Sequence, residues 1–109
     1  MKKPAPAGGD SQAFKRLERL MTTGNLWLYI VSICSRKGAH AYALPELVEK
    51  RFGFKPSRLM CYIVLYRLKA EGMIDSQSQG RRVYYRASKY GMAQLARART
   101  RIKLAASSL

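Results

Sequence analysis

The pattern of apolar positions predicts a mainly helical chain. Apolar residues recur at helical spacing over the ranges 12–21, 26–37, 44–52, 56–71 and 89–106. The residues expected at the helix starts are Ser11, Asn25 and Ser88 as caps and Pro45 in a first turn. The residues expected just past the helix ends are Gly38, Gly53 and Gly72.

Two short strands are predicted between the last two helices, at 74–78 and 83–87. The second strand alternates, with Val83, Tyr85 and Ala87 on one face and Arg82, Tyr84 and Arg86 on the other. Gly80 supplies the turn, and the arginines beside it give the hairpin a small basic tip.

Three helices, a hairpin and a further helix follow one another in the order of a winged helix-turn-helix. We therefore expect a mainly α fold with a small β-hairpin: a winged helix-turn-helix with additional N-terminal and C-terminal helices. Residues 1–11, rich in Pro, Gly and Ala, are expected to form a flexible basic arm. Residues 12–109 are expected to form a single DNA-binding domain, which includes a dimerisation helix at 89–106.

Two of the helices carry more apolar surface than one small core needs. The segment from Leu26 to Cys34 is apolar almost all round, which suggests that it also meets another subunit. It is far shorter than the ~20 residues of a membrane-spanning helix, so no membrane partner is expected. The last helix has a narrow apolar seam ringed by arginines, the pattern of a short coiled coil. The residues expected at a homodimer interface are Trp27, Leu95, Ala98, Ile102 and Ala105.

The charge balance narrows the class of partner. Lysine and arginine number 21 against 6 acids, which gives a formal net charge of +15. No acid follows Asp75, so the hairpin and the last helix carry an uncompensated positive field. Such a balance predicts a polyanionic partner, and double-stranded DNA is the polyanion that fits a winged helix.

The helix over 56–71 is the expected recognition helix, because the second helix of a helix-turn-helix enters the major groove. Arg58 is the best candidate for a bidentate contact to guanine, and Ser57 for a phosphate contact. Tyr62 would bond a phosphate or pack on a thymine methyl, while the arginines of the hairpin would reach the backbone or the minor groove. The residues expected to contact DNA are Lys55, Ser57, Arg58, Tyr62, Lys69, Arg81, Arg82 and Arg86.

Four side chains of this helix have simpler alternative roles. Tyr66 lies on the same basic stripe, but packing against the domain is the favoured interpretation. Lys69 would also serve as an ordinary solvated residue. Leu59 and Ile63 are apolar on a face expected to be partly exposed, and either the hairpin or a partner would cover them.

Three stretches resemble the PadR-type (phenolic acid decarboxylase regulator) winged-helix transcription factors, within the wider MarR-like group. The stretch from His40 to Leu44 (HAYAL) is similar to the family's H-G-Y-x-I entry into the second helix of the motif. Residues 61–74 are similar to its L-Y-P-x-L-x-R-L-x-x-x-G-L-I recognition helix, and residues 82–91 to its R-x-Y-Y-x-L-T-x-x-G wing and exit. Ile63 replaces the family's proline, and Cys61 replaces leucine.

The resemblance implies a homodimer that binds a pseudo-palindromic operator, usually to repress transcription. It carries Tyr62 over as a DNA contact. Some members bind aromatic effectors between their subunits, and Trp27 and Tyr29 belong to the helix near the expected interface. For both residues a packed core or a dry interface is the favoured role, so a small aromatic effector is only an open alternative.

No set of residues predicts an enzyme. His40 is the single histidine and matches a structural position of the family motif, with no cysteine pair or carboxylate placed for a metal site or a triad. No catalytic residue, metal or cofactor is therefore expected. Cys34 and Cys61 lie inside apolar helical patterns, which indicates buried free thiols in a reducing cytosol. We therefore expect a cytoplasmic protein, and as a DNA-binding protein it would be associated with the nucleoid.

Two other functions are alternatives to a sequence-specific repressor. The charge of +15 also suits a non-specific architectural, chromatin-like protein, because phosphate contacts supply sequence-independent affinity. A winged helix can also serve protein interaction or RNA binding. The basic stripe of the recognition helix argues against a pure protein-interaction role, since such surfaces are depleted in lysine.

Overall fold

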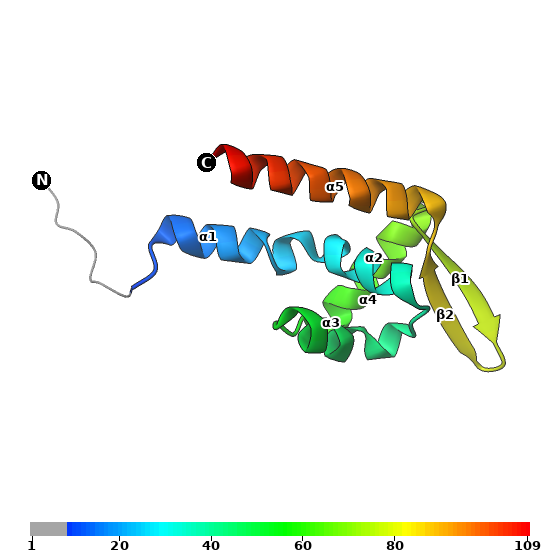
Figure 1. Cartoon of the computed structure of the whole chain (residues 1–109). Coiled ribbons are helices and arrows are strands. Elements are labelled where there is room, and N and C mark those ends of the chain that lie inside the picture. The colour runs from blue at the N-terminus through cyan, green and yellow to red at the C-terminus, as the bar shows by residue number, and fades with distance from the viewer. Residues whose placement is uncertain (1–8) are drawn as a thin grey trace, which may run out of the picture.

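The computed structural model describes residues 9–109 as a set of helices with one antiparallel hairpin (Figure 1). The helices are α1 (Gln12–Leu20), α2 (Leu26–Arg36), α3 (Leu44–Phe52), α4 (Arg58–Ala70) and α5 (Lys89–Ser108), with short 3₁₀ turns η1 (Thr23–Asn25) and η2 (Ala41–Ala43). The strands are β1 (Ile74–Gln79) and β2 (Arg82–Ala87). This order confirms the predicted winged helix-turn-helix. Residues 1–8 of the predicted arm lie outside the described residues.

Helix α2 forms the centre of the core. Ile30 and Val31 of this helix are fully covered, as are Val48 of α3 and Leu65 of α4. Its apolar character on most sides follows from this position, because α3, α4, α5 and β2 all pack against it.

The start of α5 packs closely against Gly72 and Met73, the two residues that lead into β1. The Ser88 hydroxyl caps α5 by accepting a hydrogen bond from Gly91 N–H, as predicted, and also donates to the Gly72 carbonyl at 2.6 Å. Gly91 itself lies against backbone: a Cβ on this residue would fall 2.1 Å from the Met73 carbonyl oxygen. Only a residue without a side chain therefore fits at this point of the helix.

This packing shows that part of the prediction of a dimerisation seam on α5 is wrong. Leu95 is only 7 % exposed and belongs to the core of the chain, so its side chain is not free for a partner. Ala98 is half-buried, whereas Ile102 and Ala105 are exposed on the part of α5 that extends beyond the core. Trp27 is half-buried.

Helix α1 extends from the core toward the same end of the molecule as the C-terminal half of α5 (Figure 1). Ser11 caps it as predicted, by accepting from Phe14 N–H. Every residue of α1 is exposed, including the apolar stripe of Phe14, Leu17 and Leu20. The helix therefore presents an apolar face that the described chain does not cover.

Asn25, predicted at the start of a helix, and Gly38, predicted just past the end of one, have other roles. Asn25 makes no side-chain cap for α2; its amide donates instead to the Leu20 carbonyl at 2.7 Å, which ties η1 to the end of α1. Gly38 does not adopt the left-handed backbone of a C-terminal cap, because Lys37 after α2 is already extended. A Cβ on Gly38 would lie 3.1 Å from the ring of Tyr84, so this glycine allows close approach of the hairpin.

The hairpin is joined to the helical part by a single β-bridge outside its two strands. Strands β1 and β2 pair from Ile74 with Ala87 to Gln79 with Arg82, which leaves a two-residue turn. Gly80 has a φ of 65° at its first position, the conformation such a turn requires. Ala39 pairs with Tyr85 on the outer side of β2 through two backbone hydrogen bonds of 3.0 and 2.8 Å. The segment before η2 is therefore tied to β2 at this one bridge, beside the two-stranded sheet.

Candidate nucleic-acid interface

The N-terminus of α4 is fixed by a side-chain cap. Ser57 precedes the helix, and its hydroxyl oxygen accepts a hydrogen bond from Met60 N–H at 3.1 Å. The helix thus begins two residues later than its predicted start at Pro56. Ser57 was predicted as a phosphate contact; in the structure it is first a helix cap, and its exposed hydroxyl hydrogen is still available as a donor.

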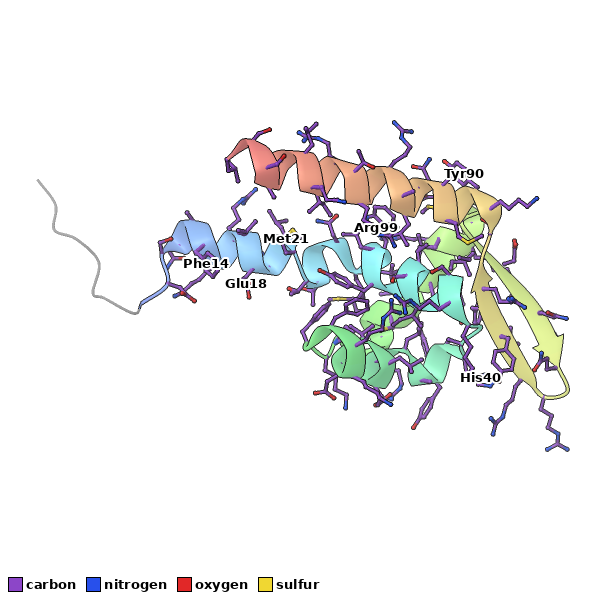
Figure 2. The ribbon with its side chains drawn as sticks, in the orientation of Figure 1. Phe14, Glu18, Met21, His40, Tyr90 and Arg99 are labelled. Atoms are coloured by element: carbon purple, nitrogen blue, oxygen red, sulfur yellow. The ribbon has the colours of Figure 1, made fainter. Side chains whose placement is uncertain are left out.

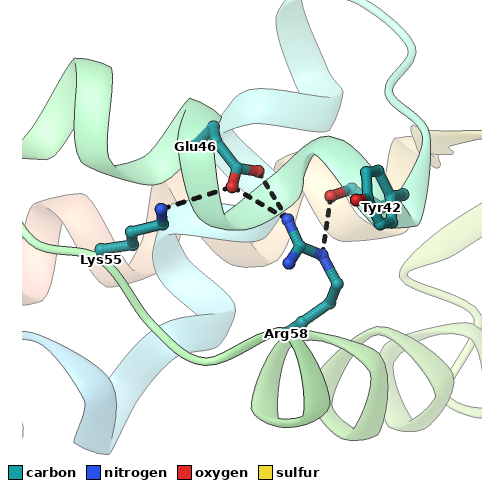
Figure 3. A network of polar contacts seen from close by, with 4 residues as sticks. All are labelled: Tyr42, Glu46, Lys55 and Arg58. Atoms are coloured by element: carbon teal, nitrogen blue, oxygen red, sulfur yellow. Dashed lines mark hydrogen bonds and ion pairs between the residues drawn. The ribbon is translucent and has the colours of Figure 1, made fainter.

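The first residue of α4, Arg58, belongs to a network that joins the two helices of the motif (Figure 3). Its Nε donates to the Tyr42 carbonyl at 3.2 Å, and its Nη2 donates to both carboxylate oxygens of Glu46 at 3.0 and 2.9 Å. The guanidinium carbon lies 4.1 Å from the centroid of the Tyr42 ring. The ammonium group of Lys55 approaches the same carboxylate at 3.4 Å. Glu46 is therefore paired with Arg58 and Lys55, two of the cations that were predicted to contact DNA.

Glu46 and Arg58 both stay charged near neutral pH. The pKa of Glu46 is lowered by the hydrogen bond from a backbone N–H in the first turn of α3 and by the hydrogen bond from Arg58. The same carboxylate raises the pKa of Arg58. Both partners are largely exposed, so this pair contributes more to the orientation of Arg58 than to the stability of the fold.

The exposed face of α4 carries aromatic, apolar and basic side chains together. Tyr62 is half-buried and Lys69 is exposed. Tyr66 is 57 % exposed, so the interpretation that it packs into the domain is wrong. Leu59 and Ile63 are 69 % and 44 % exposed, and both line an open cavity between α2, α4 and α5.

The hairpin adds a second basic group beside α4. Arg81, Arg82 and Arg86 are all exposed, with Arg81 in the turn itself. His40, labelled in Figure 2, contacts the half of β2 that is nearer the turn: its ring lies tilted against Tyr84 at a centroid distance of 4.0 Å, and its Nδ1 lies 3.1 Å from the Val83 carbonyl oxygen. A groove of about 500 Å³ lies between η2 and β2, with Tyr42 and Arg82 among the residues that line it. The basic hairpin is therefore held at a fixed position relative to the recognition helix.

The aromatic residues of α2 have different environments. Tyr29 packs edge-on against Phe52 and Phe54 and donates its hydroxyl to the Met21 carbonyl, so it has the packed role that was favoured for it. Trp27 lines an open cavity of about 690 Å³ between α2, α4 and α5, together with Ile63 and Gln94.

The other chemistry-bearing residues do not converge on a site. Cys34 and Cys61 are buried free thiols, as predicted, and burial raises their pKa values to about 12 and about 11. Over residues 9–109 there is no group of three or more potential metal ligands. Within the same residues, no helix combines the length and apolar character needed to span a bilayer.

Two features of the surface were missed by the sequence analysis. Glu46 was not among the predicted site residues, and no local pattern links it to Arg58, 12 positions away. The stripe of α1 was recognised as apolar, but its spacing does not distinguish a core face from an uncovered one.

The fold and the basic face define a winged helix-turn-helix of the kind found in PadR-family regulators. A PadR family regulator of Clostridium difficile superposes with a TM-score of 0.68 at 23 % identity, over 75 % of this chain and 91 % of that one. PadR-type regulators of Eggerthella lenta and Bacillus cereus each give a TM-score of 0.71 at 22 % identity, over 90 % and 84 % of this chain and 93 % and 91 % of theirs. No family model and no curated protein matches the sequence. These likenesses confirm, at the level of the fold, the resemblance to the PadR type.

Proposed function

We propose that this protein is a sequence-specific regulator of transcription that binds double-stranded DNA as a homodimer, and that it represses by occupying a pseudo-palindromic operator. The observation that carries the proposal is the set of solvent-accessible cations at the start of α4 and at the hairpin tip of a winged helix-turn-helix, namely Lys55, Arg58, Arg81 and Arg82. In this arrangement α4 enters the major groove, and Arg81 and Arg82 follow the flanking backbone or minor groove. Bound at a promoter in the cytoplasm, at the nucleoid, such a dimer blocks polymerase. The similar solved structures are those of transcription regulators, which supports this assignment.

The uncovered apolar face of α1 supports the homodimer. Leu17 is 51 % exposed in the middle of the stripe, and Ile102 and Leu104 are exposed on the extended half of α5. Uncovered apolar stripes on two helices that extend beyond the core are typical of an interface with a second copy. The residues of the proposed interface are Phe14, Leu17, Leu20, Trp27, Ala98, Ile102 and Ala105.

A non-specific architectural protein is the second candidate, and the exposed cations of α5 favour it. Arg97, Arg99, Arg101 and Lys103 lie far along the chain from the recognition helix and have no acidic partner among the described salt bridges. Selection of bound fragments from a random-sequence duplex library at physiological salt separates the two functions. Recovery of an inverted repeat supports the dimeric regulator, whereas uniform recovery supports the architectural protein.

Replacing Arg58 with alanine is expected to weaken binding to the selected site about tenfold or more, because an arginine–base contact is lost. The preference for the base at that position is expected to relax. Fluorescence anisotropy with the selected duplex and single-base variants measures both effects. If Arg58→Ala binds its best site as tightly as the wild type, Arg58 does not read a base.

Replacing Arg81 with alanine is expected to act differently, because the hairpin tip contacts phosphates in this proposal. Affinity for all duplexes is expected to fall by a similar factor, and the slope of log K against log salt is expected to decrease by about one unit. Titrations at several salt concentrations measure the slope. A loss confined to one base sequence would show instead that Arg81 reads bases.

A further inference from the structure

We propose that Glu46 is a specificity-determining residue of the DNA interface, which positions the Arg58 guanidinium for base reading and limits its attraction to phosphates. The inference rests on the proposed DNA-binding function and deepens it. The proposed recognition surface has a carboxylate among its cations, which a simple basic surface does not need.

Three contacts restrict the guanidinium on one edge and one face. The Tyr42 carbonyl accepts from Nε, the Glu46 carboxylate accepts from Nη2, and the Tyr42 ring covers one face at 4.1 Å. Nε and Nη2 together form the side edge of the guanidinium, and that edge is occupied by acceptors from the chain itself. Nη1 has no hydrogen-bond partner within residues 9–109, so the outer end of the group is left for an external acceptor.

A long, flexible arginine gains selectivity when its orientation is fixed before binding. An unrestrained Arg58 would turn toward whichever phosphate is near, on any sequence, because phosphate attraction does not depend on the base. Held by Glu46 and Tyr42, it can offer its remaining N–H groups in one direction, and less conformational entropy is lost when a guanine accepts them. The carboxylate also repels phosphates from this part of the surface.

The chain offers a matched control for the charge of Glu46. Glu49 belongs to the same helix α3, is exposed, and makes no salt bridge among the described residues. Glu46→Gln and Glu49→Gln therefore remove the same charge one turn apart, but only the first removes a charge that is paired with Arg58. Any effect of net charge alone appears equally in both variants.

The test measures the ratio of affinities for the selected site and for a random duplex, by anisotropy titration at one salt concentration. Glu46→Gln is expected to bind the random duplex more tightly and to lose about tenfold or more of the wild-type ratio. Glu49→Gln is expected to keep the wild-type ratio. Partial unfolding lowers both affinities equally and leaves the ratio unchanged, so the readout does not depend on stability.

A double-variant cycle tests whether Glu46 acts through Arg58. In an Arg58→Ala background, Glu46→Gln is expected to change the ratio no more than Glu49→Gln does. Equal ratios for the two single variants, or an undiminished effect without Arg58, would overturn the inference while leaving DNA binding intact. A wild-type protein that shows no preference between the two duplexes would overturn the proposed function and the inference together.

Discussion

Gly91→Ala is expected to lower the free energy of unfolding by about 3 kcal/mol. Inside a helix this exchange normally stabilises, by roughly 1 kcal/mol, so the expected change has the opposite sign to the intrinsic helix propensity. The reason is the 2.1 Å approach that a Cβ would make to the Met73 carbonyl oxygen. Backbone at this point cannot retreat easily, because Ser88 is bonded to both Gly72 and Met73.

Urea unfolding followed by circular dichroism, at one fixed protein concentration, measures the effect. Met92→Ala is the matched control, since Met92 is the next residue of α5 and is exposed. That variant is expected to unfold close to the wild-type midpoint. A Gly91→Ala protein as stable as the wild type would mean that Gly91 lies farther from the Met73 carbonyl oxygen than the structure shows.

The double variant Leu17→Asp with Ile102→Asp is expected to convert the proposed dimer into a monomer. Each aspartate places a charge on an apolar side chain that is exposed in the chain but would be desolvated between two copies. Loss of the second half-site contact is expected to reduce operator affinity about 100-fold or more, the usual range for two linked binding units.

Sedimentation velocity and operator titration together measure this change. Gln12→Asp with Thr100→Asp is the matched control, because it adds the same two charges to α1 and α5 at exposed polar positions. The control is expected to remain dimeric and to bind the operator. A Leu17→Asp, Ile102→Asp protein that sediments as a dimer would show that the apolar stripes of α1 and α5 do not form the interface.

Most of the fold could be predicted from the sequence because its signals are local. The serines at 11 and 88 cap the helices that follow them, and Gly80 forms the turn of the hairpin. Each of these roles depends on residues only a few positions away. The errors occurred where a distant element decides the outcome: Gly38 is shaped by Tyr84, and Leu95 is covered by the chain's own core rather than by a partner.

The recognition surface was predictable in its residue types but not in its internal contacts. A helical projection identifies which side chains of α4 share a face, and it grouped Tyr66 with the basic stripe correctly. It does not say whether a neighbour covers that face, and Tyr66 was therefore assigned wrongly to the interior. The ion pair of Glu46 with Arg58 depends on the crossing of α3 and α4, which periodicity within either helix does not encode.

The backbone pairing of Ala39 with Tyr85 has a consequence for the spacing of any operator. Because this bridge joins the hairpin to the segment that leads into α3, it restricts how far the hairpin can shift relative to the helix-turn-helix. In the proposed complex, the separation between base reading and flanking contacts is then set largely by the protein. An operator with one base pair added between these two regions would have to be accommodated by twisting or bending of the DNA, and its affinity would vary with the flexibility of the intervening base steps.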